Sequence, residues 1–284
     1  MATPAPRVVF LDIDGTLVDH AQHLPDSAVA AVRGARAAGH RVYLCTGRAR
    51  ASILPHVLQV GFDGVISAGG GFIESDGALL ISRAMAPADV QTLVSFFTAH
   101  DLEYTLQAFD DAYPSAGLLA RMRPILQRES PDPRLAAASA QRLVRLTTAF
   151  TYRGAAPTDT IAKATFLGRD ASAYRLVRDG LGERFHVITG SIPYLDSSGG
   201  EVSLRGMNKG TSITLLLERL GVPVSSSIAI GDSMNDIEML QTVGVGIAMG
   251  DAAADVRAIA DEVTGTVAED GVWAAFARHG LLGR

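Results

Sequence analysis

Short apolar strands alternate with candidate helices over the first 67 residues, and this alternation restricts the chain to a narrow set of folds. We expect strands at 8–11, 41–45 and 64–67, with helices around 27–38 and 50–58, the second kinked at Pro55. The first strand consists of β-branched and apolar residues, as a parallel strand buried on both faces does. A β-α-β-α-β order of this kind predicts an α/β fold with a doubly wound parallel sheet.

The last third of the chain resumes this alternation. Apolar residues recur at positions 213, 216, 217 and 220, which is the spacing of one helix face. Residues 210–220 are therefore predicted to form an amphipathic helix that ends at Gly221. The other elements expected here are strands at 227–230 and 243–248 and helices at 235–240, 253–260 and 272–278.

The middle of the chain follows a different pattern, with proline-rich irregular stretches between its elements. The elements expected here are helices at 87–100, 133–142 and 172–179 and strands at 103–108, 146–152, 162–167 and 185–189. We therefore predict a doubly wound core formed by residues 1–83 and 191–284, interrupted by an inserted α/β domain at 84–190.

Composition narrows the class of protein. Among 284 residues, 48% are hydrophobic and 19% are charged, which fits a globular protein with a sizeable core. A net charge of −5 without a basic block disfavours nucleic acid as a partner. No apolar run approaches the roughly 20 residues of a membrane span, and the N-terminus lacks a signal-peptide core. The single cysteine, Cys45, lies in an apolar run and is expected to be buried, so we predict a cytoplasmic protein.

Two aspartates follow the first strand directly. Asp12 and Asp14 lie one residue apart, ahead of Gly15 and Thr16. Like charges at the end of a buried strand are unfavourable unless a cation is near. The pair therefore predicts a divalent metal beside a carboxylate that does chemistry. The alternative is an acidic turn at a strand end without a function.

Two further short motifs carry groups that suit phosphate. Thr46, Gly47 and Arg48 follow the second strand, where a hydroxyl and backbone N–H groups can hold phosphate oxygens, although turn chemistry alone also explains them. Lys209 precedes the predicted helix 210–220, where a cation opposes the helix dipole. The chain has only two lysines against 23 arginines. A role for Lys209 is therefore preferred to a solvated lysine.

A second acidic motif follows the predicted strand 227–230. Asp232 and Asp236 lie four residues apart around a tight turn that also carries Asn235. In a parallel sheet this turn lies at the same edge as Asp12, where open α/β sheets bind ligands. Carboxylate oxygens are suitable ligands for Mg²⁺. The alternative is a turn in which the acids only cap a helix.

These four motifs, in this order, resemble those of the haloacid dehalogenase (HAD) superfamily. The size and position of the insertion, together with the stretches 246–250 and 269–272, are similar to the Cof-type branch with a type IIB (C2B) cap. That branch usually has Asn-Gly where this chain has Gly69-Gly70, so an amide is missing here. The resemblance implies that Asp12 is the nucleophile and Asp14 the general acid and base, and that Thr46, Gly47, Lys209 and Asn235 bind the phosphoryl group. It further implies a metal site formed by Asp12, the backbone carbonyl of Asp14, Asp232 and Asp236. Arg48 would be either a phosphate contact or a structural pair.

The resemblance implies a Mg²⁺-dependent phosphatase that acts on small phosphorylated metabolites through an aspartyl-phosphate intermediate. Sugar phosphates are the first expectation, with pyridoxal phosphate or flavin mononucleotide as further candidates. A phosphomutase of the phosphomannomutase type and a non-catalytic phosphometabolite-binding protein remain alternatives. The expected partner is a small-molecule phosphate ester, with no nucleic acid or membrane, in a monomer or homodimer.

Overall fold

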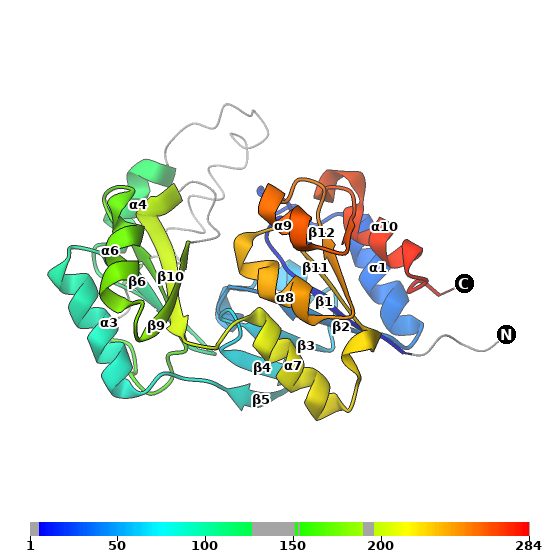
Figure 1. The fold of residues 1–284 in the computed structure, drawn as a ribbon, viewed down its shortest axis with the longest axis horizontal. Coiled ribbons are helices and arrows are strands. Elements are labelled where there is room, and N and C mark those ends of the chain that lie inside the picture. The colour runs from blue at the N-terminus through cyan, green and yellow to red at the C-terminus, as the bar shows by residue number, and fades with distance from the viewer. Residues whose placement is uncertain (1–5, 127–150, 153, 190–195, 284) are drawn as a thin grey trace. The chain divides into compact units, whose positions relative to one another are not determined.

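The computed structural model describes residues 6–126, 151–152, 154–189 and 196–283 (Figure 1). The chain divides into two compact units. The first comprises residues 1–48, 53–82 and 207–284, and the second comprises 49–52 and 83–206. Each has its own buried hydrophobic core. The second unit extends past residue 190, where the sequence placed its end.

An eight-stranded sheet forms the centre of the first unit. Its order is β13 (Glu262–Val263), β12 (Val245–Ala248), β11 (Ser227–Gly231), β1 (Val8–Leu11), β2 (Arg41–Cys45), β3 (Gly64–Ser67), β4 (Phe72–Ser75) and β5 (Ala78–Ser82). Neighbouring strands from β13 to β3 are parallel, and β4 and β5 continue the sheet antiparallel.

Helices cover both faces of this sheet. Helices α1 (Asp26–Ala37) and α10 (Gly271–Arg278) pack together on one face, and α7 (Lys209–Leu220) and α8 (Ile237–Thr242) lie on the other, next to α9 (Ala254–Ile259) (Figure 1). Strand β1 is consequently at most 2% exposed at every position. The predicted doubly wound fold is confirmed. Cys45 is fully buried, and burial raises the pKa of its thiol.

The region after β2 differs from its prediction. The expected kinked helix 50–58 is instead a 3-10 turn, Arg50–Ser52, followed by a separate short helix, α2 (Pro55–Leu58). Proline disfavours the helical conformation at the residue before it, and Leu54 is accordingly extended, so Pro55 begins a helix instead of bending one. The β4–β5 hairpin was not predicted, although Asp76 and Gly77 are a typical hairpin turn, both with positive φ.

The described residues of the second unit form a five-stranded antiparallel sheet with helices. The strand order is β7 (Ala112–Pro114), β6 (Glu103–Gln107), β8 (Lys163–Leu167), β10 (Gly199–Leu204) and β9 (Phe185–Thr189). The helices described in this unit are α3 (Pro87–Ala99), α4 (Leu118–Leu126) and α6 (Ser172–Leu181). Because β10 pairs with both β8 and β9, residues 199–204 belong to this unit and not to the core in which the sequence placed them.

Two predicted elements of the second unit, the helix 133–142 and most of the strand 146–152, lie outside the described residues. Within the described ranges, the other 3-10 turns are Asp196–Ser198, Val224–Ser226, Met234–Asp236 and Val267–Glu269. No helix in the described part of the chain has the length and apolar character that crossing a membrane requires.

Candidate active site

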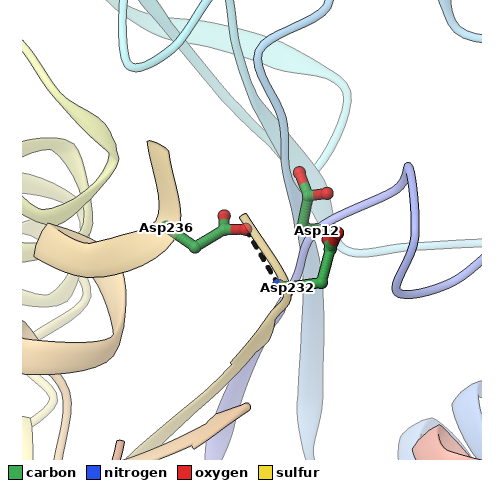
Figure 2. A group of neighbouring side chains, drawn as sticks. All are labelled: Asp12, Asp232 and Asp236. Carbon is green, nitrogen blue, oxygen red and sulfur yellow. Dashed lines mark hydrogen bonds between the residues drawn. The ribbon is translucent and has the colours of Figure 1, made fainter. Parts of the chain in front are cut away.

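The two acidic motifs meet at the carboxyl edge of the first unit's sheet. Strands β1 and β11 are parallel neighbours, and the N–H of Asp12 donates to the carbonyl of Ile230 at 3.0 Å. Carboxylate oxygens of Asp12, Asp232 and Asp236 lie within 4.8 Å of one another. Figure 2 shows Asp12 and Asp232 at the ends of these two strands and Asp236 on the turn that follows. The sequence placed these acids together, and the structure does so.

Gly15 allows Asp232 to approach the first motif. Its φ is +83°, and a Cβ atom there would lie 2.3 Å from Oδ2 of Asp232. Any other residue would therefore collide with the carboxylate. Thr16, the next residue, donates from Oγ1 to Oδ1 of Asp232 at 3.1 Å. Gly15 and Thr16 thus both turn the chain and position the carboxylate of Asp232.

Asp236 supports the turn that carries Asp232. Its Oδ2 accepts hydrogen bonds from the backbone N–H groups of Asp232 (3.1 Å, dashed in Figure 2) and Ser233 (3.0 Å). Its Oδ1 accepts from Lys209 at 2.5 Å, and its side chain is fully buried. Both carboxylate oxygens are thus engaged by protein donors. This suits a residue that holds the site in shape more than one that binds a metal directly.

Lys209 is the first residue of α7 and is 1% exposed. The helix start is fixed by a capping box between Asn208 and Thr211. Its Nζ lies 2.6 Å from Oδ1 of Asp12 and 2.5 Å from Oδ1 of Asp236. Burial alone would lower the pKa of Lys209, but the two carboxylates outweigh it and raise that pKa well above its ordinary value. The alternative of a solvated lysine is therefore wrong.

The charges of the cluster fit a divalent cation. Burial, opposed in part by Lys209, raises the pKa of Asp12 to about 7. Burial together with repulsion from Asp12 and Asp236 raises the pKa of Asp232 to about 9. Three carboxylates face one ammonium group, so two negative charges remain uncompensated when all are ionised. Clustered carboxylate oxygens with this charge are a suitable set of donors for a hard divalent metal.

The carboxylate of Asp14 is held apart from this cluster by Arg48. Its oxygens accept from Nε of Arg48 at 2.7 Å and from Nη2 at 2.5 Å, and the side chain is 40% exposed. Gln22 donates to Oδ1 of Asp14 at 2.8 Å. Burial raises the pKa of Asp14, but the hydrogen bonds and charge of Arg48, with the bond from Gln22, outweigh it, and that pKa lies below its ordinary value. Of the two alternatives for Arg48, the structure shows the pair with Asp14.

Sequence reasoning missed Gln22. It is one amide in a connecting loop, and no motif or spacing marks it. Its part in the site depends on the path of the loop, which brings residue 22 back to residue 14.

The other predicted phosphate-binding residues lie on the same sheet edge. Thr46 and Gly47 directly follow β2, and Oγ1 of Thr46, a buried residue, accepts from the backbone N–H of Arg48 at 3.1 Å. Asn235 lies in the Met234–Asp236 turn, where its Oδ1 accepts from Ser233 at 2.8 Å.

Gly69, at the position where the Cof-type branch usually has asparagine, has a φ of +64°. Asparagine also tolerates this conformation, so glycine meets the same backbone requirement without an amide.

A family model and several known proteins match the chain over most of its length. The family model of haloacid dehalogenase-like hydrolases matches residues 9–276. The chain belongs to this family. Over 266 residues the hydrolase is 29% identical to HMP-PP phosphatase of Escherichia coli O157:H7, covering 89% of this chain and 87% of that protein. Over 278 residues it is 25% identical to YkrA of Bacillus subtilis (strain 168), covering 97% of this chain and 98% of that protein.

Solved structures share the fold of the hydrolase. A haloacid dehalogenase-like hydrolase from B. subtilis has a TM-score of 0.81 at 23% identity, covering 95% of this chain and 99% of that one. The HAD subclass IIB sugar phosphatase BT4131 has a TM-score of 0.75 at 20% identity, covering 97% of this chain and 100% of that one. The predicted superfamily and enzyme class, a phosphoric monoester hydrolase, are confirmed by the family and its phosphatase relatives.

Proposed function

We propose that this hydrolase is a Mg²⁺-dependent phosphatase of small phosphorylated metabolites. The observation that carries the proposal is the environment of Asp12. Its carboxylate is buried and lies 2.6 Å from the ammonium group of Lys209. Carboxylate oxygens of Asp12, Asp232 and Asp236 also lie within 4.8 Å of one another. A carboxylate fixed by one cation and placed beside a site for another is suited to attack phosphorus.

The nucleophile in this proposal is Asp12. An oxygen of its carboxylate forms a bond to phosphorus while the bond from phosphorus to the ester oxygen breaks, which leaves an aspartyl-phosphate. The departing oxygen takes a proton from Asp14. Asp14 then removes a proton from water, whose oxygen attacks phosphorus, so that inorganic phosphate leaves and Asp12 is regenerated.

Lys209, Thr46, Gly47 and Asn235 are the proposed contacts of the phosphoryl oxygens. Asp12, Asp232 and the backbone carbonyl of Asp14, with Asp236 in support, would hold Mg²⁺. The bound metal would supply positive charge that offsets repulsion between the phosphoryl group and the attacking carboxylate. An anionic phosphoryl group beside Asp14 raises the pKa of that carboxyl. Substrate therefore opposes the effect of Arg48 and favours the protonated acid that the first step needs.

Sugar phosphates are the first substrates that we propose. The shared fold with the sugar phosphatase BT4131 supports them, and the HMP-PP phosphatase relatives add HMP-PP to the compounds worth testing. Pyridoxal phosphate and flavin mononucleotide complete the panel. We further propose that the second unit is the type IIB cap, that the protein is a cytoplasmic monomer or homodimer, and that it has no nucleic-acid or membrane partner.

The test is release of phosphate from p-nitrophenyl phosphate and from this panel, with Mg²⁺ and with a chelator. We expect turnover only with the metal, and its loss in Asp12→Asn. Asp255→Asn is a matched control, because that aspartate is exposed on α9. Turnover that requires a bisphosphate activator would favour a phosphomutase. No turnover of any ester by the unmodified protein would favour a binding protein.

A further inference from the structure

Gln22 adopts an unusual backbone conformation beside the site. Its φ is +66°, a left-handed value that residues other than glycine adopt infrequently. The loop is held by hydrogen bonds from Gln22 N–H to the carbonyl of Asp19 (2.9 Å), from His23 N–H to Oδ1 of Asp19 (2.8 Å) and from Asp19 N–H to the carbonyl of His23 (3.0 Å). A conformation of this kind persists where surrounding contacts fix it.

The side-chain amide of Gln22 connects two residues of the site. Its Nε2 donates to Oδ1 of Asp14 at 2.8 Å, and its Oε1 accepts from Nη2 of Arg48 at 2.5 Å. The same Nη2 also donates to Oδ1 of Asp14. The three side chains thus form a closed ring of hydrogen bonds, in which a neutral amide supplies one donor and one acceptor.

We propose that Gln22 is a positioning residue for the general acid. The inference rests on the proposed function and deepens it. The Asp14 side chain is 40% exposed, so packing covers only part of it and hydrogen bonds are needed to fix the carboxyl group. The fork of Arg48 and the amide of Gln22 fix the carboxyl plane from two directions. Gln22 acts through Asp14 and has no contact with the phosphoryl group in this proposal.

This role has a consequence for the choice of leaving group. An alkoxide needs a proton to leave, whereas p-nitrophenolate leaves without one. A variant that misplaces Asp14 therefore loses activity on alkyl phosphates selectively. The parameter to measure is kcat/KM, because it reports the steps up to departure of the leaving group and excludes the later hydrolysis of the intermediate.

The experiment compares Gln22→Gly and Gln22→Glu with the unmodified protein on a sugar phosphate that it hydrolyses and on p-nitrophenyl phosphate. Glycine removes the amide and suits the positive φ. Glutamate keeps an acceptor for Arg48 but removes the donor to Asp14. For both variants we expect kcat/KM to fall about tenfold or more on the sugar phosphate and to stay within about threefold on p-nitrophenyl phosphate.

His23→Gly is the matched control, because it adds the same backbone freedom to the same loop at an exposed residue. It should leave the ratio of the two kcat/KM values unchanged. Equal losses on both substrates, or no loss on either, would overturn the positioning role while leaving the proposed function intact. Failure of the unmodified protein to hydrolyse p-nitrophenyl phosphate and every compound of the panel would overturn the proposed function, and the role of Gln22 with it.

Discussion

The substitution Gly15→Ala tests whether the close approach of Asp232 determines activity. The new Cβ would lie 2.3 Å from Oδ2 of Asp232, whereas real Cβ contacts are essentially never shorter than 3.0 Å. The carboxylate must therefore move by at least about 0.7 Å. A misplacement on the order of 1 Å reduces turnover about 100-fold, which corresponds to about 2.7 kcal/mol of transition-state stabilisation.

The left-handed backbone adds a separate effect on stability. Alanine at a φ of +83° is strained by about 1 kcal/mol, whatever it contacts. Gly77→Ala separates the two effects, because Gly77 has a φ of +77° and a Cβ added there would meet no atom within 4 Å. Both variants should therefore lose the free energy of unfolding that backbone strain costs. Gly15→Ala should lose more, because its Cβ also collides with Asp232, and only Gly15→Ala should lose activity.

The assay measures kcat/KM on p-nitrophenyl phosphate over a range of Mg²⁺ concentrations, with the free energy of unfolding from urea titration. We expect Gly15→Ala to need more metal and to remain about 100-fold slower at saturation. Activity of Gly15→Ala within about threefold of the unmodified protein would refute the reasoning. An equal loss of activity in Gly77→Ala would do so as well, because backbone strain would then explain both.

Two further predictions concern the buried charges. In Lys209→Met, Asp12 and Asp236 lose their shared cation, and we expect the free energy of unfolding in urea to fall by about 3–5 kcal/mol, with phosphatase activity reduced at least about 100-fold. In metal-free protein, the pKa values of about 7 for Asp12 and about 9 for Asp232 lie above the value near 4 of unfolded aspartate. The stability that these two groups contribute is therefore fully present below pH 4 and is lost as pH rises to about 9. Melting temperatures measured across this range with chelator should show the loss, and Mg²⁺ should reverse more of it at high pH than at low pH.

Each of these two predictions would be contradicted by a specific result. A Lys209→Met protein that unfolds at the same urea concentration as the unmodified chain would show that the carboxylates tolerate the loss of their cation. Stabilisation by Mg²⁺ that does not change between pH 5 and pH 9 would show that the raised pKa values of Asp12 and Asp232 do not govern metal binding.

Much of the site followed from the chain alone. Parallel strands place their carboxyl ends on one edge of a sheet, so polar residues after Leu11, Cys45 and Ile230 must lie near one another once the strand order is known. The scarcity of lysine in this chain likewise predicted a role for Lys209. These inferences succeeded because strand ends follow from local periodicity, and parallel strands bring their carboxyl ends to one edge of the sheet.

The tertiary structure alone decided which groups pair. The ring of Asp14, Gln22 and Arg48 joins residues up to 34 positions apart, and its formation depends on a loop path that no periodicity encodes. The pairing of β10 with β8 and β9 likewise depends on contacts distant in the chain. Sequence determined which chemical groups stand at the sheet edge, because that follows from where strands end. Side-chain packing and hydrogen bonding determined what each group contacts, because those depend on the whole fold.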